Sequence, residues 1–275
     1  MIVDFEYAGE RLSEYGLIIA SVDGSSGSDV LEWANQLESQ TIRNKISGKS
    51  YTTSISYSDD YSLTFQIIKY SCKLGNIQHI SDTEWRYIER WLNRKDNLRF
   101  TPISDNKEFN GYHYYGVFNI SPIKIDGEDI IGAELTFNSN APYGFGDTVF
   151  IDATSTSMEV HSTSDELGIL PIKMTIKPSK SGNLTITNSL MNEYEPQKAT
   201  TIIKNCIANE IISLDSEHLI ITSSNPNHSK LYNDFNYVYP QLYTDYADQV
   251  NKFTFSIQCE VHMEFEPIRK VGVLV

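Results

Sequence analysis

Cysteine is scarce in this sequence. Only three occur in 275 residues, at Cys72, Cys206 and Cys259, and none belongs to a CxxC pair. That spacing excludes zinc ribbons and thioredoxin-like redox motifs. The lack of a disulfide framework favours synthesis in a reducing compartment. Cys259 falls in an apolar series that alternates with polar residues, which predicts a small buried side chain.

Positive charge is also in short supply. The chain has 22 Lys and Arg against 36 Asp and Glu, a formal net charge of −14. An acidic surface repels phosphate backbones and anionic lipid, so nucleic-acid or membrane binding is disfavoured as the main role. The opening MIVDFEYAGERL has neither the basic nor the apolar segment of a secretory signal. The apolar run YGLIIASV is too short to span a bilayer.

Signatures of catalysis are missing as well. The stretch GSSGS is neither a G-x-S-x-G elbow nor a Walker loop, and no G-x-G-x-x-G follows a predicted strand. No spacing of a nucleophile and a base, or of metal ligands, is evident. The sequence therefore predicts no catalytic residue, no cofactor and no metal site, and we do not expect an enzyme.

What is present favours β-structure. Hydrophobic residues make up 40% of the chain and aromatic residues 12%, a content that suits strands better than helical bundles. A segment rich in Asn, Gly and Pro, NSNAPYGFGD at 138–147, predicts a domain boundary. We therefore expect two domains, at 1–140 and 141–275. Short strands with turn residues between them follow the boundary and predict a β-sandwich.

One segment predicts a helix, SDTEWRYIERWLNRK at 81–95. Ser81 and Glu84 have the spacing of a capping box. Four apolar residues recur on one arc at helical spacing: Trp85, Ile88, Trp91 and Leu92. Three cations form an i, i+4 stripe on the other side: Arg86, Arg90 and Arg94. The stripe is a candidate interface for an acidic neighbour, but a solvated helix face is the commoner outcome.

The segment FTFSIQCEVHMEFE, at 253–266, alternates without a break. In a strand its two sets of side chains point to opposite faces. The polar face carries ligand types in a row, Glu260, His262 and Glu264. Neighbours on one face lie roughly 6.6 to 7 Å apart, which is wide for two ligands of one zinc ion. We therefore interpret the row as a solvated or inter-subunit face, and we expect a bulge or a strand shared between two sheet regions.

Aromatic residues cluster in YNDFNYVYPQLYTDY, at 232–246. Two interpretations carry equal weight: core packing near a sheet edge, or exposed tyrosines suited to sugar stacking or to a protein partner. The candidate contact residues are Tyr232, Phe235, Tyr237, Tyr239 and Tyr243.

The order of several short segments resembles that of phage distal tail proteins (Dit). In the first half these are FEYAGERLSEYGLII, YSDDYSLTFQIIK, EWRYIERWL, GYHYYGVF and ELTFNSNAPYGF. In the second half they are SGNLTITN, NEIISLDSEHLIIT, DFNYVYPQL, NKFTFS and FEPIRKVG. The resemblance covers nearly the whole chain, and its strength lies in the number and order of the segments.

The resemblance implies a mainly β fold and a role in architecture. It implies an N-terminal tail-tube-like β-sandwich with one α-helix, which forms a ring, followed by a C-terminal galectin-like β-sandwich. Family members form a homo-hexameric ring at the tail tip that joins the tail tube protein to the tail-associated hub protein, often with receptor-binding proteins. The expected location is the virion tail tip, after synthesis in the host cytoplasm. A carbohydrate-binding β-sandwich that contributes to host attachment is the alternative function.

Overall fold

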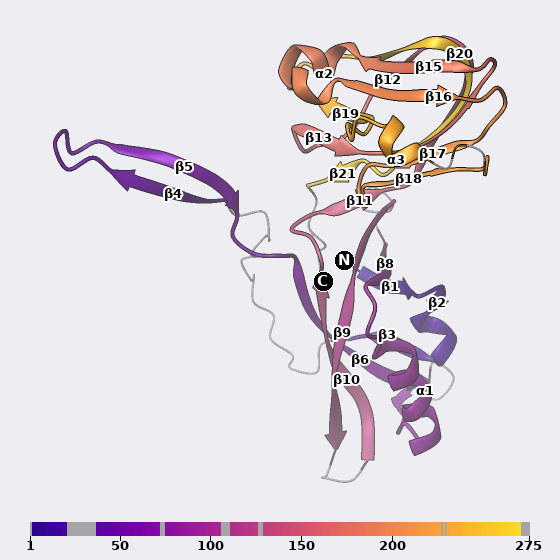
Figure 1. Cartoon of the computed structure of the whole chain (residues 1–275). Helices are drawn as coiled ribbons and strands as arrows, with labels where there is room; N and C mark the ends of the chain where they lie inside the picture. The colour runs from indigo at the N-terminus through magenta and orange to yellow at the C-terminus, as the bar shows by residue number, and fades with distance from the viewer. Residues whose placement is uncertain are drawn as a thin grey trace. The chain divides into compact units, whose positions relative to one another are not determined.

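The computed structural model describes residues 2–20, 37–71, 75–105, 111–125, 129–226, 228 and 230–270. Cys72 lies outside the described residues. The chain divides into two compact units, one formed by Met1–Phe145 with Arg269–Val275 and the other by Gly146–Ile268. Strands dominate both units (Figure 1), so the mainly β fold predicted from the sequence is confirmed.

The first unit is built on an antiparallel sheet with the strand order β2-β1-β8-β9-β10-β6-β3. Its main strands are β1 (Ile2–Tyr7), β2 (Glu10–Arg11), β3 (Leu17–Ile19), β6 (Ser62–Ser71), β8 (Leu98–Ser104), β9 (Tyr112–Ile125) and β10 (Asp129–Ser139). The remaining elements are η1 (Leu12–Tyr15), β7 (Asn76–Ile77), α1 (Asp82–Leu92) and the separate hairpin of β4 (Leu37–Arg43) and β5 (Ser50–Tyr57).

The helix α1 begins where the sequence predicts and ends earlier. Ser81 accepts a hydrogen bond from the Glu84 backbone N–H while the Glu84 carboxylate accepts one from the Ser81 backbone N–H, so the predicted capping box is present. The helix ends at Leu92 because Asn93 leaves the helical conformation, with φ −81° and ψ 79°. Arg94 is therefore not part of the helix, which corrects the predicted span of 81–95.

The core of the first unit is aromatic, and Trp91 of α1 is at its centre. Its ring stacks on Phe5 at 5.7 Å between centroids and on Tyr15 at 4.6 Å. Its indole N–H donates to the backbone carbonyl of Tyr7 at 2.8 Å, which joins the helix to β1. Trp91 thus buries a large apolar ring while its indole N–H keeps a hydrogen-bond partner, as is usual for buried tryptophan.

The second unit contains most of the remaining strands. They are β12 (Val149–Val160), β13 (Gly168–Pro171), β14 (Lys173–Pro178), β15 (Gly182–Asn188), β16 (Thr200–Cys206), β17 (Ile212–Asp215), β18 (Ile220–Ser223), β19 (Gln241–Thr244) and β20 (Asn251–Phe265). Its short helices are α2 (Ser189–Tyr194), η3 (Pro196–Lys198) and α3 (Leu231–Asp234). The strands β11 (Gly144–Gly146) and β21 (Ile268–Arg269) lie where the chain passes from one unit to the other.

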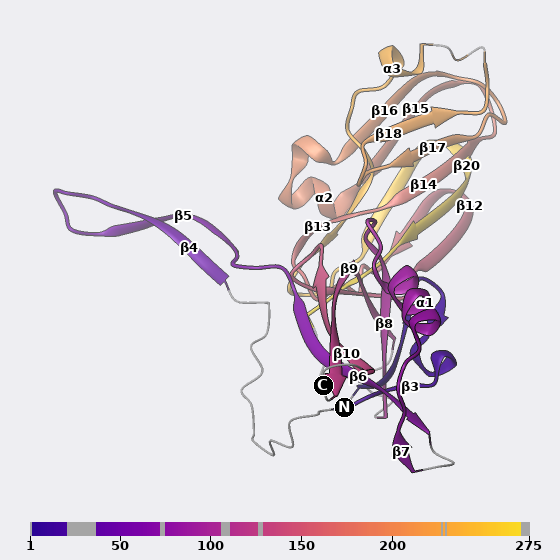
Figure 2. The ribbon, with the colours of Figure 1, turned by 90° about the horizontal axis from the view of Figure 1, so that it is seen from below.

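Strand β20 organises the second unit. It pairs with β12 along its length, and with β15 and then β14 on its other side; Figure 2 shows β20, β12 and β14 running together. The expected irregularity is present in β20: Ser155 of β12 pairs with Cys259 and Ser157 pairs with Thr254, so the extra residues lie in β20. Alternate residues of β20 from Phe253 to Phe265 are buried, as the alternation predicts. Cys259 is fully buried among them, and burial raises the pKa of its thiol to about 11.

Candidate assembly surfaces

The hairpin β4–β5 is the most exposed element that the structure describes. Its strands pair with each other and with no other described strand. Leu37 and Ile55 lie on one face, and the cross-strand pair Ile42 and Tyr51 lies on the other. All four side chains are more than half exposed. A lone two-stranded hairpin is at best marginally stable in water, so apolar residues on both faces favour cover from another chain.

The turn of the hairpin holds an isoleucine in solvent. The side-chain oxygen of Asn44 accepts the backbone N–H of Ile46 at 2.8 Å and that of Ser47 at 3.2 Å. The backbone of Asn44 also pairs with Lys49 at 2.8 Å and with Gly48 at 2.9 Å. Gly48 supplies the left-handed conformation, with φ 67°. This ordered turn presents Ile46 with 98% of its surface exposed.

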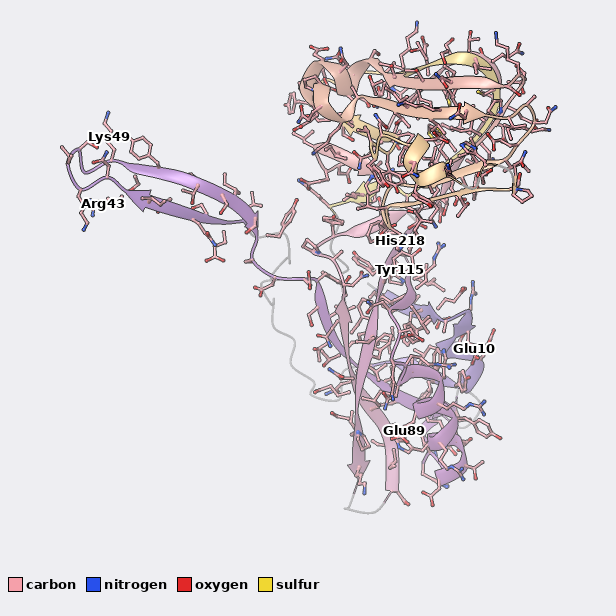
Figure 3. All side chains as sticks on the ribbon, viewed as in Figure 1. Glu10, Arg43, Lys49, Glu89, Tyr115 and His218 are labelled. Carbon is pink, nitrogen blue, oxygen red and sulfur yellow. The ribbon has the colours of Figure 1, made fainter. Side chains whose placement is uncertain are left out.

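Cations surround Ile46 in a protein that is otherwise acidic. Arg43, Lys45 and Lys49 are all exposed, and Figure 3 labels Arg43 and Lys49 beside the turn. Arg43 donates from Nε to the Gly48 carbonyl at 3.3 Å. Neither lysine forms an ion pair with any residue in the described ranges. The turn is therefore a basic tip with an apolar centre.

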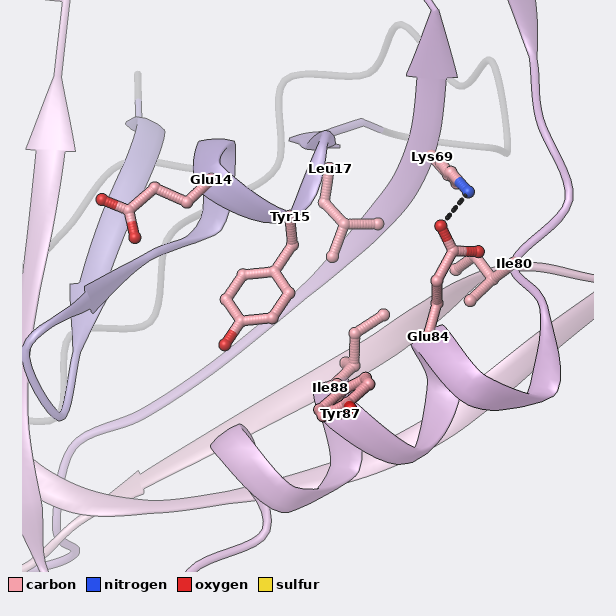
Figure 4. Close-up of a pocket in the computed structure, with 8 residues that line it drawn as sticks. All are labelled: Glu14, Tyr15, Leu17, Lys69, Ile80, Glu84, Tyr87 and Ile88. Atoms are coloured by element: carbon pink, nitrogen blue, oxygen red, sulfur yellow. Dashed lines mark hydrogen bonds and ion pairs between the residues drawn. The ribbon is translucent and has the colours of Figure 1, made fainter.

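A pocket of about 240 Å³ lies in the first unit between η1, β3, β6 and α1 (Figure 4). Its lining residues are Glu14, Tyr15, Leu17, Lys69, Ile80, Glu84, Tyr87 and Ile88. Leu17, Ile80 and Ile88 are buried and form an apolar floor. Charged side chains and the exposed ring of Tyr87 form the rim.

The rim of this pocket carries two carboxylates in different situations. Glu84 accepts a hydrogen bond from Lys69 at 2.6 Å. That bond, with the backbone N–H of Ser81, lowers the pKa of Glu84 to about 2. Glu14 is exposed and has no ion pair or hydrogen bond to another residue that the structure describes. Glu14 is therefore the rim charge that remains available to a partner.

The predicted arginine stripe is only partly a helix face. Arg86 and Arg90 are exposed on α1 and form no ion pair with the described residues. Arg94 follows the helix and donates from Nε to the Trp91 carbonyl at 3.1 Å, so it caps the C-terminal end. The role of Arg86 and Arg90 at an interface stays a prediction.

The polar row on β20 is engaged by neighbouring strands. Glu260 pairs with Lys177 of β14 at 3.0 Å. His262 Nδ1 lies 2.7 Å from the carboxylate of Asp152 on β12, and Glu264 stands opposite Lys173 in the register. These cross-strand pairs give the row a local structural role. Within the described ranges, no group of three His, Cys, Asp or Glu residues is arranged to hold a metal ion.

Strand β12 presents a long edge. Among the described strands it pairs with β20 alone, through eleven of its twelve residues. Phe150 on this strand is 61% exposed and stacks near His262, with 5.9 Å between ring centroids. Ile151 on the opposite face is only half-buried. Long edge strands with apolar residues are sites for contact with other chains unless they are covered.

The aromatic run 232–246 divides into buried and exposed members. Phe235 and Tyr239 are buried and pack edge to face at 4.9 Å. The Tyr239 hydroxyl donates to the Leu219 carbonyl at 2.6 Å. Tyr243 is half-buried and stacks on Tyr194 at 4.6 Å. Core packing therefore accounts for these three members of the run.

Of the five candidate residues, Tyr232 and Tyr237 face solvent, at 58% and 65% exposure, and Tyr246 at the end of the run is 95% exposed. Tyr237 also adopts a left-handed backbone conformation, with φ 58°, which is uncommon for a bulky residue. The sugar-contact interpretation therefore retains two of its five candidate residues.

A buried glutamate–histidine pair supports this region, and sequence reasoning missed it. The side chains of Glu210 and His228 are 0% and 2% exposed and lie 3.0 Å apart. Glu210 also accepts hydrogen bonds from Ser223 at 2.8 Å and from the Ile207 backbone at 2.7 Å. His228 Nε2 lies 3.5 Å from the carboxylate of Asp234. The residues are distant in sequence and share no motif, so no local signal could have identified them.

These features define a class: a mainly β structural protein with surfaces suited to assembly. Two family models match the chain. The model of a phage tail protein N-terminal domain matches residues 1–141, and that of a phage tail C-terminal domain matches residues 143–265. The chain belongs to this family of phage tail proteins. No match was found among the curated proteins, and none of the helices in the described residues is long and apolar enough to cross a membrane.

Solved structures of phage proteins have a similar fold. The crystal structure of the Dit protein of phage SPP1 is similar, with a TM-score of 0.63 and 15% identity, over 97% of this chain and 99% of that one. A chain of the phage p2 baseplate in its activated conformation with Sr has a TM-score of 0.46 and 8% identity, over 99% and 100%. The two family models and the similarity to SPP1 Dit confirm the resemblance to distal tail proteins found in the sequence.

Proposed function

We propose that this phage tail protein works at the tail tip, where six copies close into a ring. The ring joins the tail tube protein to the tail-associated hub protein and holds receptor-binding proteins. The number of copies and the partners follow the family resemblance. They fit the similarity to SPP1 Dit, which is described as a paradigm of the hub adsorption apparatus in phages that infect Gram-positive bacteria.

The observation that carries the proposal is the hairpin β4–β5, because the described residues of its own chain leave both faces uncovered. Leu37 and Ile55 on one face and Ile42 and Tyr51 on the other would remain in water in a monomer. A ring with closed symmetry gives every copy the same neighbour and so covers every hairpin in the same way.

Two further features support assembly. The outer edge of β12 offers a second surface for a neighbouring protein. The net charge of −14 suits a channel through which DNA passes, since an acidic wall gains nothing from counterion release and does not retain the DNA.

The mass of the assembly tests the proposal. Light scattering and native mass spectrometry of the purified 31.3 kDa chain, alone and with the tail tube and hub proteins, should detect six copies, and negative-stain images should show closed rings. The variant Leu37→Ser/Ile55→Ser should shift the equilibrium toward monomer, whereas Leu219→Ser, an equally exposed residue of the second unit, should not. A monomer at every concentration, with no binding to either tail partner, would refute the proposal.

Carbohydrate binding by the second unit is the alternative function, and the exposure of Tyr232 and Tyr237 favours it. Exposed tyrosines are suited to stacking on sugar rings. A glycan array probed with the assembled protein should give signals that Tyr237→Ala abolishes, while Tyr246→Ala, an exposed tyrosine of the same run, leaves them unchanged. A silent array would remove this alternative.

A further inference from the structure

The basic tip of the hairpin has the properties of an anchor. Turns favour polar residues, yet Ile46 is 98% exposed at the centre of this turn. The backbone of the turn is fixed by hydrogen bonds to Asn44, so little backbone entropy is lost when the tip binds. Apolar side chains that enter a pocket from a preorganised backbone provide much of the affinity of protein interfaces.

The pocket beside α1 has the matching properties. Its volume of about 240 Å³ is below the roughly 300 to 1,000 Å³ typical of small-molecule sites, which favours a single side chain as the occupant. Its floor of Leu17, Ile80 and Ile88 is apolar, and Glu14 on its rim is available to a cation. Ile46 is almost fully exposed, so the pocket of its own chain does not hold it.

We propose that Ile46 of one copy inserts into the pocket between η1 and α1 of a second copy of this chain. Lys45 and Lys49, on either side of the isoleucine, then lie close to the rim and pair with Glu14. This inference rests on the self-assembly proposed above and names its contact. Charge complementarity favours a second copy as the partner, because the tip is basic and the chain as a whole has a net charge of −14.

Disulfide trapping tests the contact directly. Ile46→Cys and Tyr87→Cys, the latter at the exposed rim of the pocket, are introduced into separately tagged chains and co-expressed. Oxidation should give a heterodimer of twice 31.3 kDa that carries both tags. Each variant expressed alone controls for the native cysteines. Ile46→Cys paired with Ile220→Cys, an exposed position of the second unit, controls for random collision.

Binding measurements add a second readout. Ile46→Ser should weaken self-association by about 30-fold, from the loss of one buried aliphatic side chain. Glu14→Lys should weaken it by about threefold, as expected for an exposed pair. Lys45→Glu/Lys49→Glu should restore part of that loss when it is combined with Glu14→Lys.

The outcomes separate this inference from the proposed function. A heterodimer that forms only between the Ile46 and Tyr87 variants supports it. Six-membered rings that form without this cross-link, or with equal cross-linking to the Ile220 variant, would overturn the proposed contact. The proposal of a six-membered ring would still stand. The absence of self-association at any concentration, alone or with the tail partners, would overturn both.

Discussion

A single methyl group added at Gly132 should destabilise the first unit strongly. Gly132 is buried in β10, beside the register shift between Ile130 and Gly132 where β10 pairs with β9. A Cβ atom built there would lie 2.1 Å from the backbone carbonyl oxygen of Ile67 in β6. The obstacle is backbone, so no side-chain rotation relieves it.

The size of the effect follows from this geometry. The contact must open from 2.1 Å to at least 3.0 Å, which stretches the ladder between β6 and β10. Overpacking costs about 1 to 3 kcal/mol, and each weakened hydrogen bond adds about 1 kcal/mol. Gly132→Ala should therefore lower the free energy of unfolding by about 3 kcal/mol, a large share of the roughly 5 to 15 kcal/mol available to a domain.

Tryptophan fluorescence during urea unfolding measures this loss, because all three tryptophans of the chain precede Gly146 and so belong to the first unit. With an m value of about 2 kcal/mol/M, the midpoint should fall by about 1.5 M. Gly48→Ala is the control: its φ of +67° is unfavourable for alanine, but nothing lies within 4 Å and the hairpin is outside the core. Equal midpoints for the two variants would refute the steric argument.

Three further predictions concern charge and the core. Glu210→Ala and His228→Ala should each lower the free energy of unfolding by about 3 kcal/mol, because each leaves a buried polar partner without its contact. The double variant should lower it by about 2 kcal/mol less than the sum of the two single variants. Additive losses in unfolding followed by far-ultraviolet circular dichroism would contradict the coupling. The folded-state pKa of Glu84, lowered from 4.5 to about 2, means that its pair with Lys69 stabilises the fold above pH 4.5 and is lost as the pH falls toward 2. Because the pair is exposed, Glu84→Gln should remove less than about 1 kcal/mol and flatten acid unfolding in that interval; an unchanged acid limb would contradict this. Trp91→Phe removes a hydrogen bond to a buried carbonyl and should cost about 1 to 2 kcal/mol by urea titration, and an unchanged midpoint would show that this bond contributes little.

Strong periodicity explains what could be predicted from the sequence. The alternation from Phe253 to Phe265 determines which face of β20 is buried, and the apolar arc ending at Leu92 defines the buried face of α1. Both patterns are long, and each lies within one continuous segment, so one sequence suffices to identify them. The end of the helix is not encoded in this periodicity, because the conformation of a single residue, Asn93, determines it.

The hairpin and the buried Glu210–His228 pair could not be predicted, for physical reasons. In the hairpin, the irregular register around Thr53 interrupts the alternation, and apolar residues occur on both faces, so no single period identifies it. The Glu210–His228 pair depends on the way distant loops meet. In the aromatic run, buried and exposed side chains alternate irregularly, and the left-handed backbone at Tyr237 is not evident from composition.

The positions of the basic tip and of its proposed pocket determine how copies of the chain would add to one another. The basic tip and its proposed pocket are formed by different elements of each copy, so each copy both gives and receives one contact. Such a heterologous contact continues until the rotation between neighbours closes a ring, and it forms a filament if the rotation does not close. The acidic remainder of the surface disfavours side-by-side association of completed rings, since like charges repel. A basic tip on an otherwise acidic chain therefore favours growth around the ring over aggregation.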